Sequence, residues 1–356
     1  MNGFLRKTSS RVRGWARRIW RPTRAIRYRD DVCRFRPLPG VELLVVVDPS
    51  LSDPVSAAVR NGSNPNEVVL ELMAQIVRPG DRVLDLGSHI GLFALTAAAL
   101  GCEVLAVEAS RRNAGLLGVA ARLNGFNNLH LVNCAVGSGT GLAAFCEDGP
   151  FGSLAGDRVP RPVTSRVPVL SVQSLLAGMG WDQLSFVKMD VEGSELAAVA
   201  GMGPILESAQ APAVFFESNE HTLHFFSQTP QALHTAFCEA GYTCHQVGAR
   251  RLTLCRPAEA QGPTCVDYLA VKASLPELPK GWEVAAGFTP AELIEQFHTD
   301  LAGTNPDLRA SAARRLATAP PALLASPLLQ TGLRLLHDDE SERVRAAACW
   351  HSRQAA

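Results

Sequence analysis

The chain has 356 residues, of which 47% are hydrophobic and 19% charged, and its formal net charge is zero. This length suits one large domain or two smaller ones, and the composition excludes an intrinsically disordered protein. The charge is unevenly distributed, because residues 1–36 contain twelve Arg and Lys against two Asp, a net charge of +10. The rest of the chain therefore carries a net charge of −10.

Neither a membrane span nor a secretory signal is predicted. The apolar run 41–47 has seven residues and the run 92–107 contains Glu103, whereas a helix that crosses a bilayer needs about 20 apolar residues. The basic N-terminus lacks the apolar segment of a signal peptide. The nine cysteines show no paired spacing, so we expect reduced thiols rather than disulfides or a zinc site, and a cytoplasmic location.

The basic tail, residues 1–36, permits three interpretations. Trp15, Ile19 and Trp20 lie among arginines and could form an interfacial helix, which would place the protein peripherally at the inner membrane face. The tail could instead bind a nucleic acid or an acidic partner, or it could be a flexible arm that aids solubility. An Arg-rich, acid-poor N-terminus also resembles a transit peptide.

After the tail, predicted strands and helices alternate. The strands cover 36–49, 82–88, 103–109, 129–136, 184–191, 213–218 and, near the end, 242–247, 251–256 and 266–272; the helices cover 64–81, 91–100, 110–124, 193–208 and 230–240. Residues 140–170 are rich in Gly and Pro and predict an irregular segment, a hairpin or a flap. The alternation predicts an α/β fold with a mainly parallel, Rossmann-like sheet covered by helices on both faces. Ligands of such sheets bind outside the carboxyl ends of the strands.

The last part of the chain differs from the rest. Residues 274–282 are Pro-rich and predict a linker, after which we expect short helices and no strands. The segments 306–317 and 342–352 share a pattern with a period of 36 residues, which weakly resembles two HEAT-like repeats or is an unrelated helical appendix. We therefore expect a tail at 1–36, a main domain at 37–273 and a helical appendix at 282–356 that could bind a protein partner.

The stretch "VLDLGSHIGLF" predicts a cofactor-binding turn. Gly87 and Gly91 flank a turn from strand to helix, where a ligand could lie against bare backbone at the positive end of the helix. A dinucleotide site would favour GxGxxG, but here the order is GxxxG with His89 between the glycines. A nucleotide-dependent oxidoreductase is therefore disfavoured.

An acidic residue follows at the end of the next predicted strand. Glu108 lies 23 residues after Asp85, and an acid at this place can bind both hydroxyls of a ribose. Because no pyrophosphate fingerprint accompanies it, we expect the ribose of S-adenosylmethionine (SAM). Asp85 would then meet the methionine end of SAM, directly or through water. The alternative is a purely structural turn.

The stretch "VKMDVEGSE" concentrates acids at the end of another predicted strand. Asp190 ends the strand beside the cofactor crevice, where a base for an acceptor hydroxyl should lie, and Glu192 follows on the loop. Lys188 could pair with one of these acids or contact the acceptor. Glu195 falls in the first turn of the next helix, where a negative charge is favourable.

The next predicted strand supplies further candidates. Glu217 lies at its end and His221 follows on the loop, where it could act as a base or simply be solvated. Asp190, Glu192 and Glu217 could together bind a hard divalent cation. The spacing does not require a metal.

Together these motifs make the chain similar to the FkbM-type class I SAM-dependent methyltransferases. That family has a "DxGANxG"-like first motif, an acid at the end of the second strand, a late "KxDVEGxE" and then "Px(h)xxE". Here these are "DLGSHIG", Glu108, "KMDVEGSE" and "PAVFFE", within residues 64–272. Two departures are His89, where Asn is commoner, and Gln173, where many relatives have Asp.

The resemblance implies a SAM-dependent O-methyltransferase with a Rossmann-like class I sheet. The acceptor would be a hydroxyl of a sugar, a surface glycan or a secondary metabolite. The implied cofactor-binding residues are Asp85, Gly87, Ser88, His89, Gly91 and Glu108, and the implied catalytic residues are Asp190, Glu192, Glu217 and Lys188. A different possibility is a scaffold or binding protein that holds SAM weakly and works through its appendix and tail.

Overall fold

The computed structural model describes residues 31–48, 53–156, 162–208, 210–260, 265–272, 281–302, 306–316, 321–342 and 344–348. The expectations for the basic tail up to residue 30, and for most of the Pro-rich linker, lie outside the described residues. Within the described ranges, no helix combines the length and the apolar character needed to cross a membrane.

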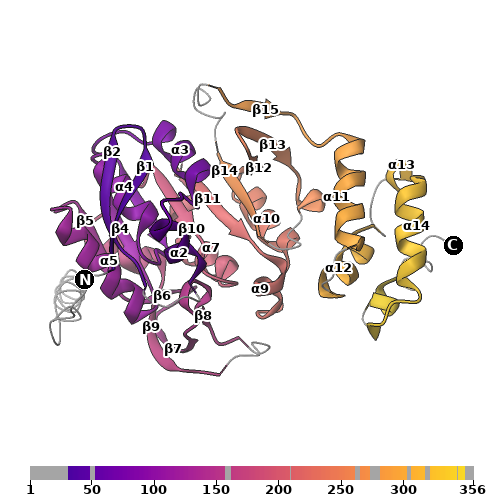
Figure 1. The fold of residues 1–356 in the computed structure, drawn as a ribbon, viewed down its shortest axis with the longest axis horizontal. Helices are drawn as coiled ribbons and strands as arrows, with labels where there is room; N and C mark the ends of the chain where they lie inside the picture. Colours follow the sequence, from indigo (N-terminus) through magenta and orange to yellow (C-terminus); the bar gives the residue numbers. More distant parts are fainter. Residues whose placement is uncertain are drawn as a thin grey trace, which may run out of the picture.

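A large mixed sheet organises the main domain (Figure 1). Its strands, in spatial order, are β5 (Leu129–Val132), β4 (Glu103–Val107), β3 (Arg82–Leu86), β10 (Phe186–Met189), β11 (Ala213–Ser218), β14 (Val266–Val271), β12 (Thr243–Gly248), β13 (Arg251–Cys255) and β15 (Glu283–Ala285). The run from β5 to β11 is parallel, and β14 lies antiparallel to both β11 and β12. The predicted Rossmann-like sheet is therefore confirmed.

Alternation along the strands gives the sheet two buried faces. On β10, Phe186 belongs to one apolar cluster and its neighbour Val187 to the other, because successive side chains point to opposite faces. The first cluster includes α3 (Glu67–Ile76), α4 (Leu92–Ala99) and α5 (Arg111–Leu123); the second includes α6 (Val172–Met179), α7 (Glu195–Met202), α8 (Pro204–Glu207) and α10 (Pro230–Glu239). Helices thus cover both faces, as predicted.

The N-terminal part differs from its prediction. The single expected strand is a hairpin of β1 (Val32–Leu38) and β2 (Val41–Val46), which turns at Gly40 with a φ of +82°. Residues 32–36, expected to end the basic tail, therefore belong to β1. A helix that was not predicted, α2 (Pro54–Arg60), follows, with the Asp53 side chain as its N-cap.

The predicted irregular segment contains a small second sheet. Its strands are β6 (Ala135–Val136), β9 (Ser165–Leu170), β7 (Gly141–Cys146) and β8 (Ser153–Leu154), with the short helix η1 (Gly149–Phe151) between β7 and β8. The antiparallel pairing of β7 and β9 confirms the hairpin alternative. The strand expected at 129–136 divides into β5 and β6, which join different sheets. The helix expected at 193–208 divides into α7 and α8 at Gly203, which is followed by Pro204.

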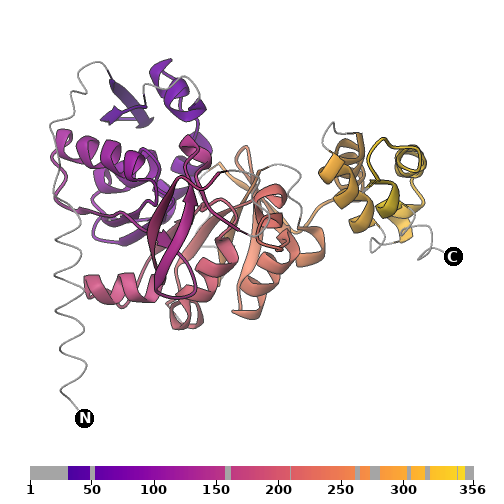
Figure 2. The ribbon, with the colours of Figure 1, turned by 90° about the horizontal axis from the view of Figure 1, so that it is seen from below.

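The C-terminal part adds a strand and a separate helical cluster. The expectation of no strands after the linker was wrong, because β15 pairs with β13 and Trp282 packs into the core of the main domain. The helices that follow, α11 (Pro290–Ala302), α12 (Pro306–Leu316), α13 (Pro321–Leu324) and α14 (Pro327–Leu336), have their own apolar cluster and lie to one side of the sheet (Figure 2). The helix α12 also contacts α9 (Glu220–His224). The HEAT-like assignment remains a prediction.

Candidate active site

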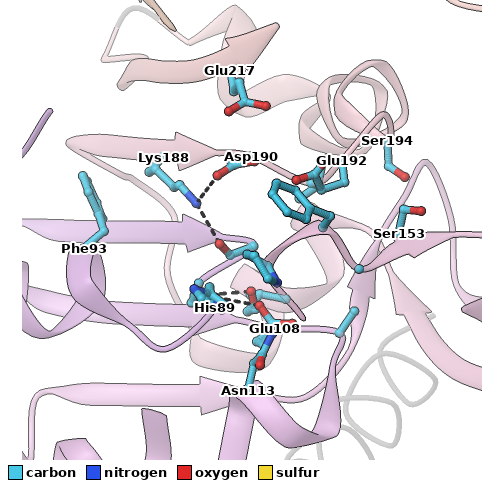
Figure 3. Close-up of a pocket in the computed structure, with 18 of the residues that line it drawn as sticks. His89, Phe93, Glu108, Asn113, Ser153, Lys188, Asp190, Glu192, Ser194 and Glu217 are labelled. Carbon is cyan, nitrogen blue, oxygen red and sulfur yellow. Dashed lines mark hydrogen bonds and ion pairs between the residues drawn. The ribbon is translucent and has the colours of Figure 1, made fainter. Parts of the chain in front are cut away.

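A cavity of about 330 Å³ lies at the carboxyl edge of the large sheet. Its walls come from the ends of β3, β4, β10 and β11, from the start of the antiparallel β14, from residues 149–154, which include β8, and from α2 and α3. Figure 3 shows Glu108 and Asn113 at one end and Asp190, Glu192 and Glu217 at the other. The two acidic motifs predicted from the sequence therefore face one cavity.

The two glycines of the first motif are required by packing. Gly87 and Gly91 have φ values of +75° and +90°, which strongly favour glycine. A Cβ on Gly87 would lie 1.7 Å from the carbonyl oxygen of Asp190, and one on Gly91 would lie 2.1 Å from Cδ1 of Leu117. We expected these glycines to admit a ligand, but their missing side chains make room for the loop after β10 and for α5.

Glu108 is fixed at the end of β4 by two backbone amides. Its Oε2 accepts a hydrogen bond from the His89 amide and its Oε1 one from the Ser110 amide, each at 2.7 Å. Burial raises the pKa of Glu108, and the two amides oppose this rise. A carboxylate oxygen can accept more than one hydrogen bond, so this arrangement fits the paired hydroxyls of a ribose.

His89 lies on the same turn with a φ of +50°. Its Nε2 is 3.2 Å from Oδ2 of Asp53, a buried residue just before α2. Asp53 was not predicted as part of the site, because it is distant in sequence from every motif and precedes a helix that was not expected. A sequence signal existed in the order Asp-Pro at residues 53–54, which is typical of an N-cap followed by the first helical residue.

Lys188 joins the two motifs across the sheet. Its buried ammonium donates to the carbonyl oxygen of Gly87 at 2.7 Å and lies 3.1 Å from Oδ2 of Asp190 and 3.8 Å from Oδ1 of Asp85. Burial lowers the pKa of Lys188, but the attraction of Asp190 and Asp85 outweighs this effect and raises it above its ordinary value. Lys188 therefore remains charged and positions Asp190.

Asp85 and Ser88 support the turn from within the protein. Asp85 is fully buried and is not among the described residues that line the cavity. Burial raises its pKa to about 6, against the opposing effect of Lys188. The Ser88 hydroxyl donates to the Asp85 carbonyl at 2.9 Å. Of the predicted cofactor residues, Gly87, Ser88, His89 and Glu108 line the cavity, whereas Asp85 and Gly91 do not.

The acids at the other end of the cavity crowd together. Asp190, Glu192 and Glu217 each offer an oxygen within 4.8 Å of the others. Burial, followed by repulsion from Asp190 and Glu192, raises the pKa of Glu217 to about 10. At neutral pH Glu217 therefore carries a proton, and it can donate a hydrogen bond but cannot act as the base.

A further acid, Asp267, was missed by the sequence analysis. It lies on β14 directly opposite Glu217 and lines the cavity. Burial and repulsion from Asp190 raise its pKa to about 6. Its position follows from the reversed direction of β14, which brings the start of this strand to the edge where its neighbours end. A parallel last strand would have placed Asp267 at the opposite edge.

Three other residues considered from the sequence lie outside the described cavity wall. Glu195 is buried and its Oε1 accepts hydrogen bonds from the amides of Val191 and Gly193 at 3.1 Å, so it shapes the acidic loop. His221 is exposed on α9 with its ring 4.7 Å from that of Phe225. Gln173 is exposed on α6, so the departure from the family pattern at this position does not alter the cavity.

The fold and the cavity together define the class of this protein. A doubly wound sheet, a glycine turn after its first central strand and a ribose-suited acid after the next are the features expected of a class I SAM-dependent methyltransferase. Residues 85–244 match the family model described as the methyltransferase FkbM domain. This match supports a SAM-dependent methyltransferase with an FkbM-type domain in this part of the chain, as the motifs indicated.

Comparison with solved structures shows only distant similarity. A SAM-dependent methyltransferase from Agrobacterium tumefaciens has 14% identity and a TM-score of 0.37, with 71% of this chain and 74% of that chain covered. A precorrin-6y C5,15-methyltransferase from Geobacter metallireducens has 10% identity, coverage of 64% and 93%, and a TM-score of 0.37. TYW2 from M. jannaschii, in complex with AdoMet, has 12% identity, coverage of 69% and 87%, and a TM-score of 0.35. No curated protein sequence matches the chain significantly.

Proposed function

We propose that this protein is a SAM-dependent O-methyltransferase in which Asp190 accepts the proton of an acceptor hydroxyl. The observation that carries the proposal is the position of Asp190, which lines the same cavity as the ribose-suited Glu108 and is held by the Lys188 ammonium. The side chain of Asp190 is 33% exposed, so an acceptor can reach it. Glu108, His89 and the backbone of the glycine turn would hold SAM.

The chain's own residues would perform the proton transfer and the positioning. SAM, when bound, supplies an electrophilic methyl group, whose bond to sulfur breaks with the electron pair left on sulfur as the new carbon–oxygen bond forms. Asp190 takes the hydroxyl proton, and Lys188 keeps Asp190 oriented toward the acceptor. Glu217, protonated at neutral pH, can donate a hydrogen bond to a second oxygen of the acceptor.

The charge of the cavity restricts the acceptor class. The described lining includes five carboxyl groups (Glu108, Asp190, Glu192, Glu217 and Asp267) and two basic side chains (His89 and Lys188). An acceptor with phosphate or carboxylate groups next to its hydroxyl would be repelled. We therefore favour a neutral hydroxyl, on a sugar, a surface glycan or a secondary metabolite, in agreement with the family resemblance. A divalent cation on Asp190, Glu192 and Glu217 would be compatible with this chemistry but is not needed for it.

Calorimetry with SAM followed by a search for the acceptor tests the proposal. A scaffold protein should not bind SAM, whereas an enzyme should bind it and release S-adenosylhomocysteine when given a suitable alcohol. An untargeted comparison of metabolites and glycans between a deletion strain and its parent should find a compound that lacks one methyl group. SAM binding with nitrogen or carbon methylation of that compound would contradict the O-methyltransferase assignment while leaving the methyltransferase class intact.

The proposed roles of the basic tail and of the helical appendix come from the sequence. The basic tail would hold the enzyme at an anionic membrane surface or an acidic partner, and the helical appendix would offer a protein-binding surface. The contact between α12 and α9 supports treating the appendix as part of the working enzyme.

A further inference from the structure

The cavity has few groups that could bind a carboxylate. His89 and Lys188 are the basic side chains among its described lining residues. The Lys188 ammonium is already bound by the Gly87 carbonyl and paired with Asp190 and Asp85. His89 has one acidic ion-pair partner among the described residues, Asp53, and is therefore the less engaged of the two basic groups.

The amino-acid end of SAM carries such an anion, its carboxylate. At one end of the cavity lies Glu108, suited to the ribose, and at the other lie the acids around Asp190, which would repel a carboxylate. Next to Glu108 the wall carries His89, which precedes the N-terminus of α4. The N-terminus of a helix is favourable for an anion, so this wall alone combines two features that suit the carboxylate.

We propose that His89 binds the methionine carboxylate of SAM, and that Asp53 is the residue that positions it. This inference rests on the proposed use of SAM. Neither the glycine turn nor the usual Asn of the family supplies a positive charge at position 89, so the histidine changes how this chain would recognise its cofactor.

The contacts of His89 support this role. Its amide is fixed by Glu108 at 2.7 Å, and its Nε2 lies 3.2 Å from Oδ2 of Asp53. Among the described residues the buried Nε2 makes no hydrogen bond besides this contact, and the side chain lines the cavity. The charged groups that face His89 are Asp53, before α2, and Glu108, at the end of β4.

Asp53 is itself held rigidly. Its Oδ1 accepts from the amides of Val55 and Ser56, each at 3.0 Å, and its Oδ2 accepts from the Ser56 hydroxyl at 2.7 Å. Burial would raise the pKa of Asp53, but His89 and Ser56 lower it to about 2. A fixed, ionised Asp53 therefore orients the imidazole and at the same time anchors α2 beside the cavity.

The test compares two ligands by calorimetry on the full chain. S-adenosylhomocysteine carries the carboxylate, and 5′-methylthioadenosine lacks the amino-acid part but keeps the adenosine and the sulfur. A charged hydrogen bond typically contributes about 1.5–3 kcal/mol, so His89→Ala should weaken S-adenosylhomocysteine roughly 10- to 100-fold and 5′-methylthioadenosine less than about twofold. Because Ala is disfavoured at positive φ and Asn is tolerated there, His89→Asn provides a second variant with an intermediate loss.

Asp53→Asn tests the positioning role. Asn is also a good N-cap, so α2 should remain intact, while the loss of charge should weaken S-adenosylhomocysteine several-fold and spare 5′-methylthioadenosine. Asp48→Asn is the matched control, because Asp48 lies in the same N-terminal segment and pairs with Arg112 at 2.6 Å. It should leave both affinities unchanged.

Each outcome decides the proposal. An equal loss of both ligands in His89→Asn would mean that His89 only supports the turn and Glu108, and an unchanged affinity for S-adenosylhomocysteine would remove His89 from carboxylate recognition. A wild-type protein that binds neither ligand would instead overturn the proposed function itself.

Discussion

The carboxyl groups at the two ends of the cavity have very different surroundings. At the cofactor end, the carboxylate of Glu108 is satisfied by two backbone amides at 2.7 Å. At the acceptor end, Asp190, Glu192, Glu217 and Asp267 gather around a single lysine, and the pKa of Glu217 rises to about 10 through burial and repulsion. The first end is arranged to hold a ligand in one place. At the second end the buried carboxyl groups repel one another, and a bound proton or acceptor reduces this repulsion. Such an arrangement is expected of a site that carries out chemistry.

Among substitutions at the two ends of the cavity, Asp190→Asn should have the largest effect. The substitution keeps the size of the side chain but removes the charge that accepts a proton, and general-base assistance typically contributes about 10²–10⁴-fold. We therefore expect a loss of this size in kcat with the true acceptor, and a SAM affinity within a few-fold of the wild type.

Asp182→Asn is the control for this prediction, because Asp182 is an exposed residue whose ion pair with Arg82 lies outside the cavity. Near-full activity of Asp190→Asn would make the acidic loop a structural helix entrance. Glu192→Gln is a second comparison. A loss of kcat equal to that of Asp190→Asn would indicate that the two residues share a carboxylate or metal site.

Glu108→Ala should act on the cofactor end. The ribose hydroxyls would lose charged hydrogen bonds that typically contribute about 1.5–3 kcal/mol, so calorimetry should record SAM binding weakened roughly 10- to 100-fold. Glu103→Ala is the control, because Glu103 lies at the opposite end of the same strand and is exposed. Equal affinities of the wild type and Glu108→Ala would remove Glu108 from the cofactor site.

At both ends of the cavity the sequence predicted the residues that end a strand. Alternation of strands and helices along the chain was enough to place Gly87, Glu108 and Asp190 at one edge of the sheet. Asp53 reaches His89 through the packing of a separate N-terminal segment, and Asp267 reaches the cavity through the reversal of β14. Local patterns carry no signal for such long-range arrangements, and the pairing of β15 with β13 was missed for the same reason.

The raised pKa of Glu217 at the acceptor end should also make the stability of the protein depend on pH. The pKa of Glu217 is about 10 in the folded protein and near its ordinary value of 4.5 in the unfolded chain. Between these pH values the folded state binds a proton that the unfolded state has lost, so stability falls as the pH rises through this interval. Glu217→Gln removes the effect, and its Tm relative to wild type should increase by a few degrees from pH 5 to pH 9.

Glu207→Gln, on the exposed surface of α8, is the control for this measurement and should follow the wild type at both pH values. A Glu217→Gln curve parallel to that of the wild type would show that Glu217 is ionised in the folded protein. In that case Glu217 would again become a candidate base.

The smallest effect is expected from deletion of residues 1–30. The cofactor and acceptor ends are both built from residues after Asp53, and the first described contact of the chain, the hydrogen bond from the Val47 amide to the Asp31 carbonyl at 2.9 Å, lies beyond the deleted segment. The truncated protein should therefore keep its Tm and its SAM affinity within error.

What should change is binding to anionic vesicles, because the deletion removes ten of the twelve basic residues of the tail. Flotation with phosphatidylserine-containing liposomes measures this directly: loss of binding supports the interfacial helix, and equal behaviour of both proteins favours the solubilising arm. A loss of SAM affinity on truncation would contradict the separation between the tail and the site.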